Sequence, residues 1–184
     1  LMFAMIFVVL NIGNVFQWWY SDMSETNLPV REGTWGLHRS QAGRYEILFP
    51  SESETWKTSF ESEDFRKMKV FHVTSQDEPN NMMYGVAYND YPRKLTDEEV
   101  KRELNHAKTL PGVDAKVLKV KELKIEGYPA YEVTTKIGPI YQISRYCIVE
   151  NRRLYSIQVG SQNIPNNIEK NVDVFFDSFK ILSR

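Results

Sequence analysis

The histidines and the single cysteine are the side chains of this sequence best suited to metal binding, acid–base catalysis or nucleophilic attack. His38, His72 and His106 lie far apart and lack the short spacing with which two ligands on one helix or strand reach the same metal ion. Cys147 lies in an apolar run, which is typical of a buried thiol. We therefore predict no catalytic residue, no cofactor-binding residue and no metal ligand.

The sequence also lacks the motifs of several common activities. It has no Gly-x-Ser-x-Gly nucleophile elbow, no Walker loop for phosphate binding and no glycine pattern for dinucleotides. Its 23 basic and 24 acidic residues leave a formal net charge of -1 without a strong block of one sign, so we expect no nucleic-acid partner. These absences favour a protein that is not an enzyme, although distant residues could still assemble a Ser-His-Asp arrangement.

Ten tyrosines offer a different chemistry, because an aromatic ring can stack on a ligand while its hydroxyl forms a hydrogen bond. Five of them fall at alternating positions of expected strands: Tyr84, Tyr88, Tyr131, Tyr141 and Tyr155. Two interpretations stay open, a platform for a carbohydrate or protein partner, or packing in the core and at its rim. The pair Arg152 and Arg153, at an expected hairpin turn, could likewise hold an anionic group or be solvated.

Residues 1–20 form the least polar part of the sequence, and no charged residue occurs before Asp22. As a helix rising ~1.5 Å per residue, this uncharged stretch would measure about 31 Å, close to the ~30 Å hydrocarbon thickness of a bilayer. Asn11, Gly13 and Asn14 interrupt it, and no Ala-x-Ala-like cleavage site follows the apolar core. We expect a signal peptide or an uncleaved membrane anchor, the anchor being favoured; a core helix of the domain is the alternative.

The remaining sequence divides into a linker and one domain. Residues 21–43 mix Ser, Glu, Thr, Asn, Pro and Gly and predict a tether of low intrinsic order, with Trp35 as its docking point. Residues 44–184 have the length of one ordinary domain with a single hydrophobic core.

Alternating apolar residues predict that this domain is rich in antiparallel strands. The expected strands cover residues 45–49, 65–74, 83–91 and most of 116–159, with turns near Gly127, near Gly138 and at residues 150–153. Residues 51–64 are expected to form a polar connection. A change of phase after Val120 suggests a β-bulge.

Two helices are expected to pack on the sheet. Thr96 and Glu99 form a capping box at the start of the first helix. Its buried stripe is expected to comprise Val100, Leu104 and Ala107. The second begins near Pro165, and its stripe is expected to comprise Ile168, Val172, Phe175, Phe176 and Phe179. The chain is then expected to leave this helix for a short final strand.

The order of these elements resembles the PsbP-like superfamily, which includes DcrB-like bacterial envelope proteins. The segments that carry the resemblance are Tyr45–Pro50, Ile125–Glu132, Arg153–Ile157 and Phe175–Ile181. The resemblance implies an α+β fold, with an antiparallel β-sheet flanked by helices in an α/β/α sandwich. It also implies a binding or accessory role without known catalysis, and no functional residue is transferred from it.

Together, these observations predict a non-catalytic binding or accessory module of the cell envelope. We expect it to be extracytoplasmic, either secreted or anchored in the membrane through residues 1–20, with no cofactor. Two alternatives stay open: a carrier of an apolar small molecule, held between sheet and helix, and a hydrolase of unrecognised type.

The first testable prediction concerns residues 1–20. Deleting Leu1 to Tyr20 should release a soluble, folded domain, because the remaining sequence carries its own apolar core. Size-exclusion chromatography and circular dichroism would check this. Aggregation of the truncated protein would instead show that the apolar segment belongs to the folded core.

Overall fold

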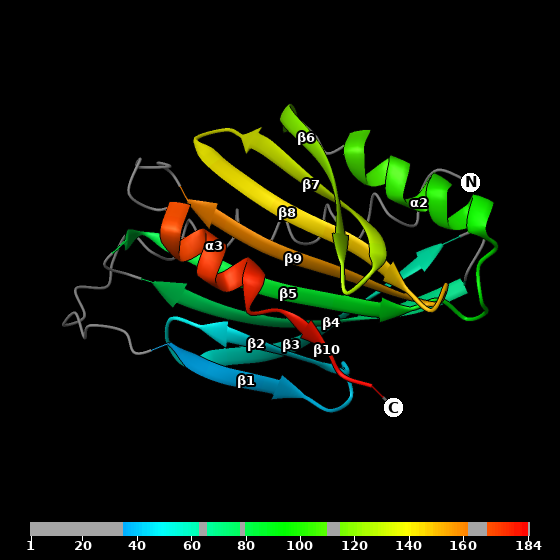
Figure 1. Cartoon of the computed structure of the whole chain (residues 1–184), viewed down its shortest axis with the longest axis horizontal. Helices are drawn as coiled ribbons and strands as arrows, with labels where there is room; N and C mark the ends of the chain where they lie inside the picture. Colours follow the sequence, from blue (N-terminus) through cyan, green and yellow to red (C-terminus); the bar gives the residue numbers. More distant parts are fainter. Residues whose placement is uncertain (1–34, 63–65, 78–79, 110–114, 162–168, 184) are drawn as a thin grey trace.

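The computed structural model describes residues 35–62, 66–77, 80–109, 115–161 and 169–183, and most of these residues lie in two antiparallel sheets (Figure 1). The larger sheet has seven strands, in the order β3-β4-β5-β9-β8-β7-β6, and the smaller has the order β1-β2-β10. The strands of the larger sheet are β3 (Ser53–Ser62), β4 (Arg66–Asp77), β5 (Met82–Asp90), β6 (Ala115–Ile125), β7 (Tyr128–Ile137), β8 (Ile140–Val149) and β9 (Arg153–Ser161). Those of the smaller sheet are β1 (Gly36–Ser40), β2 (Tyr45–Phe49) and β10 (Lys180–Ile181).

Helix α2 (Asp97–Thr109) covers one face of the seven-stranded sheet and begins at the predicted capping box. The Thr96 hydroxyl accepts a hydrogen bond from the Glu99 amide at 3.2 Å, and the Glu99 carboxylate accepts one from the Thr96 amide at 2.8 Å. The predicted stripe of Val100, Leu104 and Ala107 is buried against the sheet. The first helix and its orientation on the sheet are therefore confirmed.

Helix α3 (Glu169–Asp177) and the three-stranded sheet together cover the opposite face. Phe175 and Phe176 of α3 and Tyr45 of β2 join one buried cluster with residues of β5, β8 and β9. Ser178 ends the helix, since its hydroxyl donates to the Phe175 carbonyl at 2.7 Å and accepts from the Leu48 amide at 2.9 Å. This bond ties the end of α3 to β2.

The antiparallel α+β architecture is as predicted, and the structure corrects its outer layer. The prediction is one antiparallel sheet flanked by helices, whereas the structure has a second, three-stranded sheet beside α3 on one face. The predicted tether extends too far, because Gly36–Ser40 forms β1 and pairs with β2 in register. Trp35 docks as predicted, with its ring edge-on to Tyr84 at a centroid distance of 5.6 Å.

Three further differences concern local elements. The expected polar connection at residues 51–64 contains the ten-residue strand β3, which pairs along its length with β4. The register shift in β6 lies between Val117 and Lys119, earlier than the phase change suggests. Phe179 is buried beyond the end of α3 rather than on the helix, and the predicted final strand is β10.

The remaining predictions about the N-terminus lie outside the described residues. These are the expected membrane-directed segment 1–20 and most of the expected tether 21–43. Pro165 and Ile168, which are expected in the second helix, also lie outside the described residues. Within the described ranges, no helix has both the length and the apolar character needed to cross a membrane.

The second prediction tests the packing of α3. Phe176 is 4 % exposed, and the Arg145 guanidinium lies 4.4 Å from the centre of its ring. Phe176→Ala should lower the free energy of unfolding by about 3 to 5 kcal/mol, because it removes a buried aromatic ring and leaves a cavity. Urea denaturation measures the change. The exposed Asp173→Ala on the same helix should change it by less than about 0.5 kcal/mol, and an equal effect of both variants would contradict the packing.

Candidate functional site

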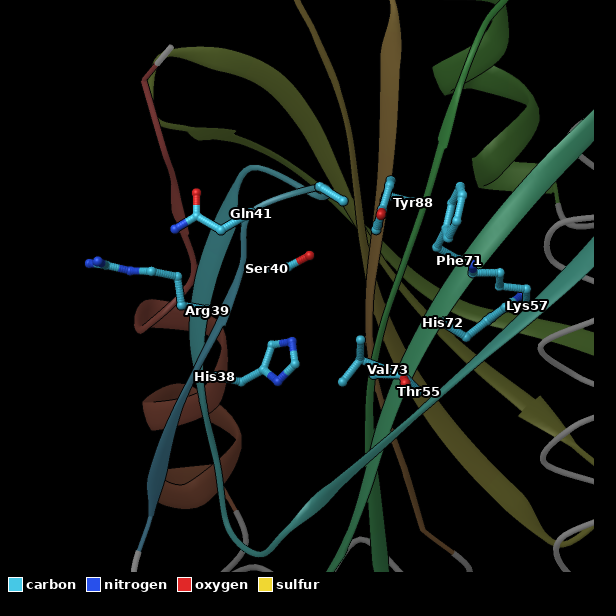
Figure 2. A pocket seen from close by; sticks show the side chains of 11 residues that line it. His38, Arg39, Ser40, Gln41, Thr55, Lys57, Phe71, His72, Val73 and Tyr88 are labelled. Carbon is cyan, nitrogen blue, oxygen red and sulfur yellow. The ribbon is translucent and has the colours of Figure 1, made fainter.

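A groove of about 530 Å³ lies where the β1–β2 hairpin faces the larger sheet (Figure 2). We call it the hairpin groove, and its lining residues are His38, Arg39, Ser40, Gln41, Ala42, Thr55, Lys57, Phe71, His72, Val73 and Tyr88. Its volume falls within the roughly 300 to 1,000 Å³ of small-molecule sites. Figure 2 shows His38 directed from β1 toward the wall formed by the larger sheet, while the Arg39 side chain extends away from it. This follows from the alternation of side chains along a strand.

The far wall of the groove is a pair of stacked rings. Phe71 on β4 and Tyr88 on β5 are partners across the two strands, and their ring planes lie 11° from parallel at a centroid distance of 4.9 Å. The Lys57 ammonium lies 5.3 Å from the centre of the Phe71 ring, and the Arg153 guanidinium lies 4.9 Å from that of Tyr88. The aromatic wall therefore has a cation at each end.

The loop at residues 41–43, which closes one end of the groove, is held by residues at the start of β9. Arg153 donates two hydrogen bonds of 2.6 Å to the Asp90 carboxylate and one of 2.9 Å to the Ala42 carbonyl. The Tyr155 hydroxyl donates to the Gly43 carbonyl at 2.6 Å. A Cβ at Gly43 would lie only 2.5 Å from the Tyr45 ring, so this close approach requires glycine. The loop is therefore fixed in place on the larger sheet.

His38 supplies a neutral imidazole on the hairpin side of the groove. Its ring stacks on Tyr45 with a centroid distance of 5.9 Å, and its Nδ1 atom lies 3.1 Å from the Ser53 hydroxyl. Partial burial lowers the pKa of His38 below its ordinary value of 6.5. The residue is therefore mainly uncharged at neutral pH and can serve as a hydrogen-bonding group.

The contact between Ser53 and His38 resembles part of a nucleophile–base arrangement. Such an arrangement also needs a third group that orients the base. Among the residues that the structure describes, no carboxylate contacts His38, whose recorded partners are Ser53, Tyr45 and Phe49. Within the described residues, the pair is therefore a polar contact that lacks the orienting group of such an arrangement.

The three histidines considered in the sequence are not brought to one site. His38 lines the hairpin groove, and His72 is also in its lining. The neighbours of His72, Phe71 and Val73, belong to the cluster on the groove face, whereas its cross-strand partner Ala87 belongs to the cluster under α2, so strand alternation places the His72 side chain on the face that carries α2 and His106. Within the described ranges, no group of three His, Cys, Asp or Glu side chains could hold a metal ion. Cys147 is buried as predicted, and burial raises the pKa of its thiol to about 12.

The predicted tyrosine set separates into core and surface residues. Tyr84, Tyr88 and Tyr155 are buried in the aromatic core, where they pack against α3 and β2. Tyr131 and Tyr141 are half-buried, and the ammonium groups of lysines lie 3.8 Å and 5.0 Å from their ring centres. These contacts favour packing over a continuous platform.

The two arginines at the predicted hairpin turn, Arg152 and Arg153, have different environments. Arg153 forms hydrogen bonds with the Asp90 carboxylate, whereas Arg152 is exposed.

A second group of polar side chains lies on the sheet face that carries α2. Gln142 donates to the Ser144 hydroxyl at 2.8 Å, and Gln158 donates to the Ser156 hydroxyl at 2.6 Å. All four residues are buried, and Ser144 faces Gln158 across the β8–β9 ladder. Among the residues that the structure describes, the Oε1 atoms of both glutamines have no hydrogen-bond partner.

Sequence reasoning did not find the hairpin groove. Lys57 and Thr55 lie in a segment interpreted as a polar connection, and His38 lies in the segment interpreted as a tether. The one usable signal was Trp35, which indicated that the chain before residue 44 contacts the domain. The groove arises from pairing between distant segments, which periodicity within one segment does not report.

Comparisons with known proteins identify the fold. No model of a known protein family and no curated protein matches the chain. The solution structure of a cyanobacterial PsbP (CyanoP) from Synechocystis sp. is similar with a TM-score of 0.53 and 12 % identity, covering 86 % of this chain and 99 % of that one. A Pseudomonas aeruginosa protein of unknown function, titled as a putative regulator, matches at 12 % identity and a TM-score of 0.32, covering 76 % of this chain and 90 % of that one.

The similarity to CyanoP confirms a PsbP-like fold for this chain. It extends over nearly the whole of the other chain, so the shared part is the complete sandwich rather than one motif. At this level of identity it establishes the fold alone.

The third prediction concerns the buried His72 of β4. His72 is 3 % exposed, and burial lowers its pKa from 6.5 to about 4. Between these values the unfolded chain binds a proton that the folded chain does not, so stability falls as the pH is lowered through this window. The loss should reach about 3 kcal/mol at pH 4, at 1.36 kcal/mol for each pKa unit.

Urea denaturation between about pH 7 and pH 4 measures this dependence. The variant His72→Gln should lose most of the decline, and the contribution of His38 cancels because it is present in both proteins. An unchanged pH dependence in the variant would show that His72 is accessible to protons in the folded state.

Proposed function

We propose that this protein is a non-catalytic binding or accessory module of the cell envelope, exported or held at a membrane through residues 1–20, and that the hairpin groove is its binding site. The observation that carries the binding site is the combination of an open groove of about 530 Å³ with a stacked aromatic wall. Small-molecule sites in proteins commonly combine an apolar wall with a few polar groups in this way.

The rigidity of the groove also supports a binding role. The loop that closes it is fixed by Arg153 and Tyr155, and its far wall is carried by the paired strands β4 and β5. When a site is already formed before its ligand binds, less of the binding free energy is lost to ordering its side chains. The PsbP-like fold is in keeping with an accessory role, which is what the resemblance implies.

The extracytoplasmic location rests on the sequence of residues 1–20. An uncharged stretch of this length, ending in Trp18, Trp19 and Tyr20, suits a signal peptide or an anchor with aromatic residues at the membrane interface.

Of the two alternatives, the carrier of an apolar molecule fits the groove less well. That alternative places its ligand between sheet and helix, whereas the hairpin groove lies between the two sheets and has polar residues in its lining. The contact between Ser53 and His38 is the observation that favours a hydrolase, which would require a carboxylate to approach His38.

The fourth prediction tests the binding site in the full chain. In a screen of small neutral and charged fragments followed by NMR, the amide signals that shift should belong to β1, β3, β4 and the loop at residues 41–43. The variant Thr55→Trp places a bulky ring in the groove and should abolish these shifts.

The matched control is Glu54→Trp, because Glu54 is exposed on the same strand and does not line the groove. It should leave the shifts intact. Shifts confined to another surface, or unaffected by Thr55→Trp, would contradict the assignment of the groove as the binding site.

A further inference from the structure

The hairpin groove contains an unbalanced positive charge. None of the ion pairs among the described residues includes Lys57. The two arginines near the groove, Arg39 and Arg153, are each paired with a carboxylate. Arg39 pairs with Glu46 at 2.7 Å, and Arg153 pairs with Asp90 at 2.6 Å. Of these three cations, Lys57 is therefore the one available to an anionic ligand.

The position of Lys57 couples this charge to an aromatic surface. Lys57 and Phe71 are partners across the β3–β4 ladder, and the ammonium lies over the ring at 5.3 Å. One face of the half-buried Phe71 ring stacks on Tyr88. The Lys57 ammonium covers the other face, so a flat apolar group in the groove can contact the edge of the Phe71 ring while an attached anion reaches that ammonium.

The rest of the lining adds hydrogen-bonding groups without further charge. His38 is mainly neutral at pH 7, and Thr55 presents a hydroxyl on the strand that carries Lys57. Figure 2 shows Arg39, the other Lys or Arg residue of the lining, directed away from the groove. A lysine binds either anion as a point charge, and a phosphate dianion is matched best when a forked arginine or backbone amides are added; one ammonium alone balances a single negative charge.

We propose that the hairpin groove binds a small planar monocarboxylate, with its flat apolar body against the edge of the Phe71 ring and its carboxylate on Lys57. This inference rests on the proposed function, because it assigns a ligand class to the same groove. It states that charge, in addition to shape, selects the ligand.

The fifth prediction compares three probes by NMR titration of the full chain at pH 7: benzoate, its neutral isostere benzamide, and phenyl phosphate. Benzoate should bind in the groove roughly fivefold more tightly than benzamide, since a charge-assisted hydrogen bond contributes more than a neutral one. Phenyl phosphate should bind more weakly than benzoate.

The variant Lys57→Met retains an apolar chain of similar length and should remove the preference for benzoate over benzamide. Lys101→Met, on the exposed side of α2, is the matched control and should preserve it. Phe71→Leu should weaken both benzoate and benzamide, because it removes the aromatic edge that the ligand contacts but not the charge.

The outcomes separate this inference from the proposed function. Equal binding of benzoate and benzamide in the groove would overturn the carboxylate assignment and leave the groove as a binding site. Phenyl phosphate binding as tightly as benzoate would overturn the choice of a monocarboxylate. If none of the three probes shifts groove signals, the inference fails, whereas the proposed function fails only if the wider fragment screen also leaves the groove silent.

Discussion

The packing of the small sheet on the large one depends on the buried ring of Tyr45. This ring contacts Tyr88, Tyr155 and Phe179 at centroid distances of 6.2, 6.0 and 5.6 Å, and His38 stacks on it from β1. The contacts link β2 to the centre of the larger sheet and to the segment after α3. The hairpin groove exists because this cluster holds β1 and β2 at a fixed separation from β3 and β4.

Much of the fold follows from local sequence signals. The capping box at Thr96, the alternation at Tyr45 to Phe49 and the turns at Gly127 and Gly138 all correspond to observed elements. Each signal is contained within a few residues, which is why periodicity and turn chemistry detect it. Strands β1 and β3 were missed because they are polar segments whose only requirement is a partner strand with free backbone groups.

The candidate site is less predictable than the fold, because it too depends on pairing between strands that are distant in the sequence. His38, Lys57 and Phe71 come from three strands in two sheets, and only the register of β3 on β4 brings Lys57 over Phe71. No motif joins them in the sequence. The alternating tyrosines are the more visible pattern in the sequence. Tyr84 and Tyr155, however, are buried in the core, and Tyr88 lies at the groove with its ring stacked on Phe71.

The buried glutamine and serine pairs of β8 and β9 have a consequence for folding fidelity. Successive side chains of a strand alternate between faces, so slippage by a single residue would turn Gln142 and Ser144 toward the aromatic side and expel Ile143 from it. Amide groups forced among Phe and Tyr rings would lose their hydrogen bonds, and misaligned hairpins would be strongly disfavoured. These polar pairs thus disfavour pairing of β8 with β9 in any register shifted by one residue.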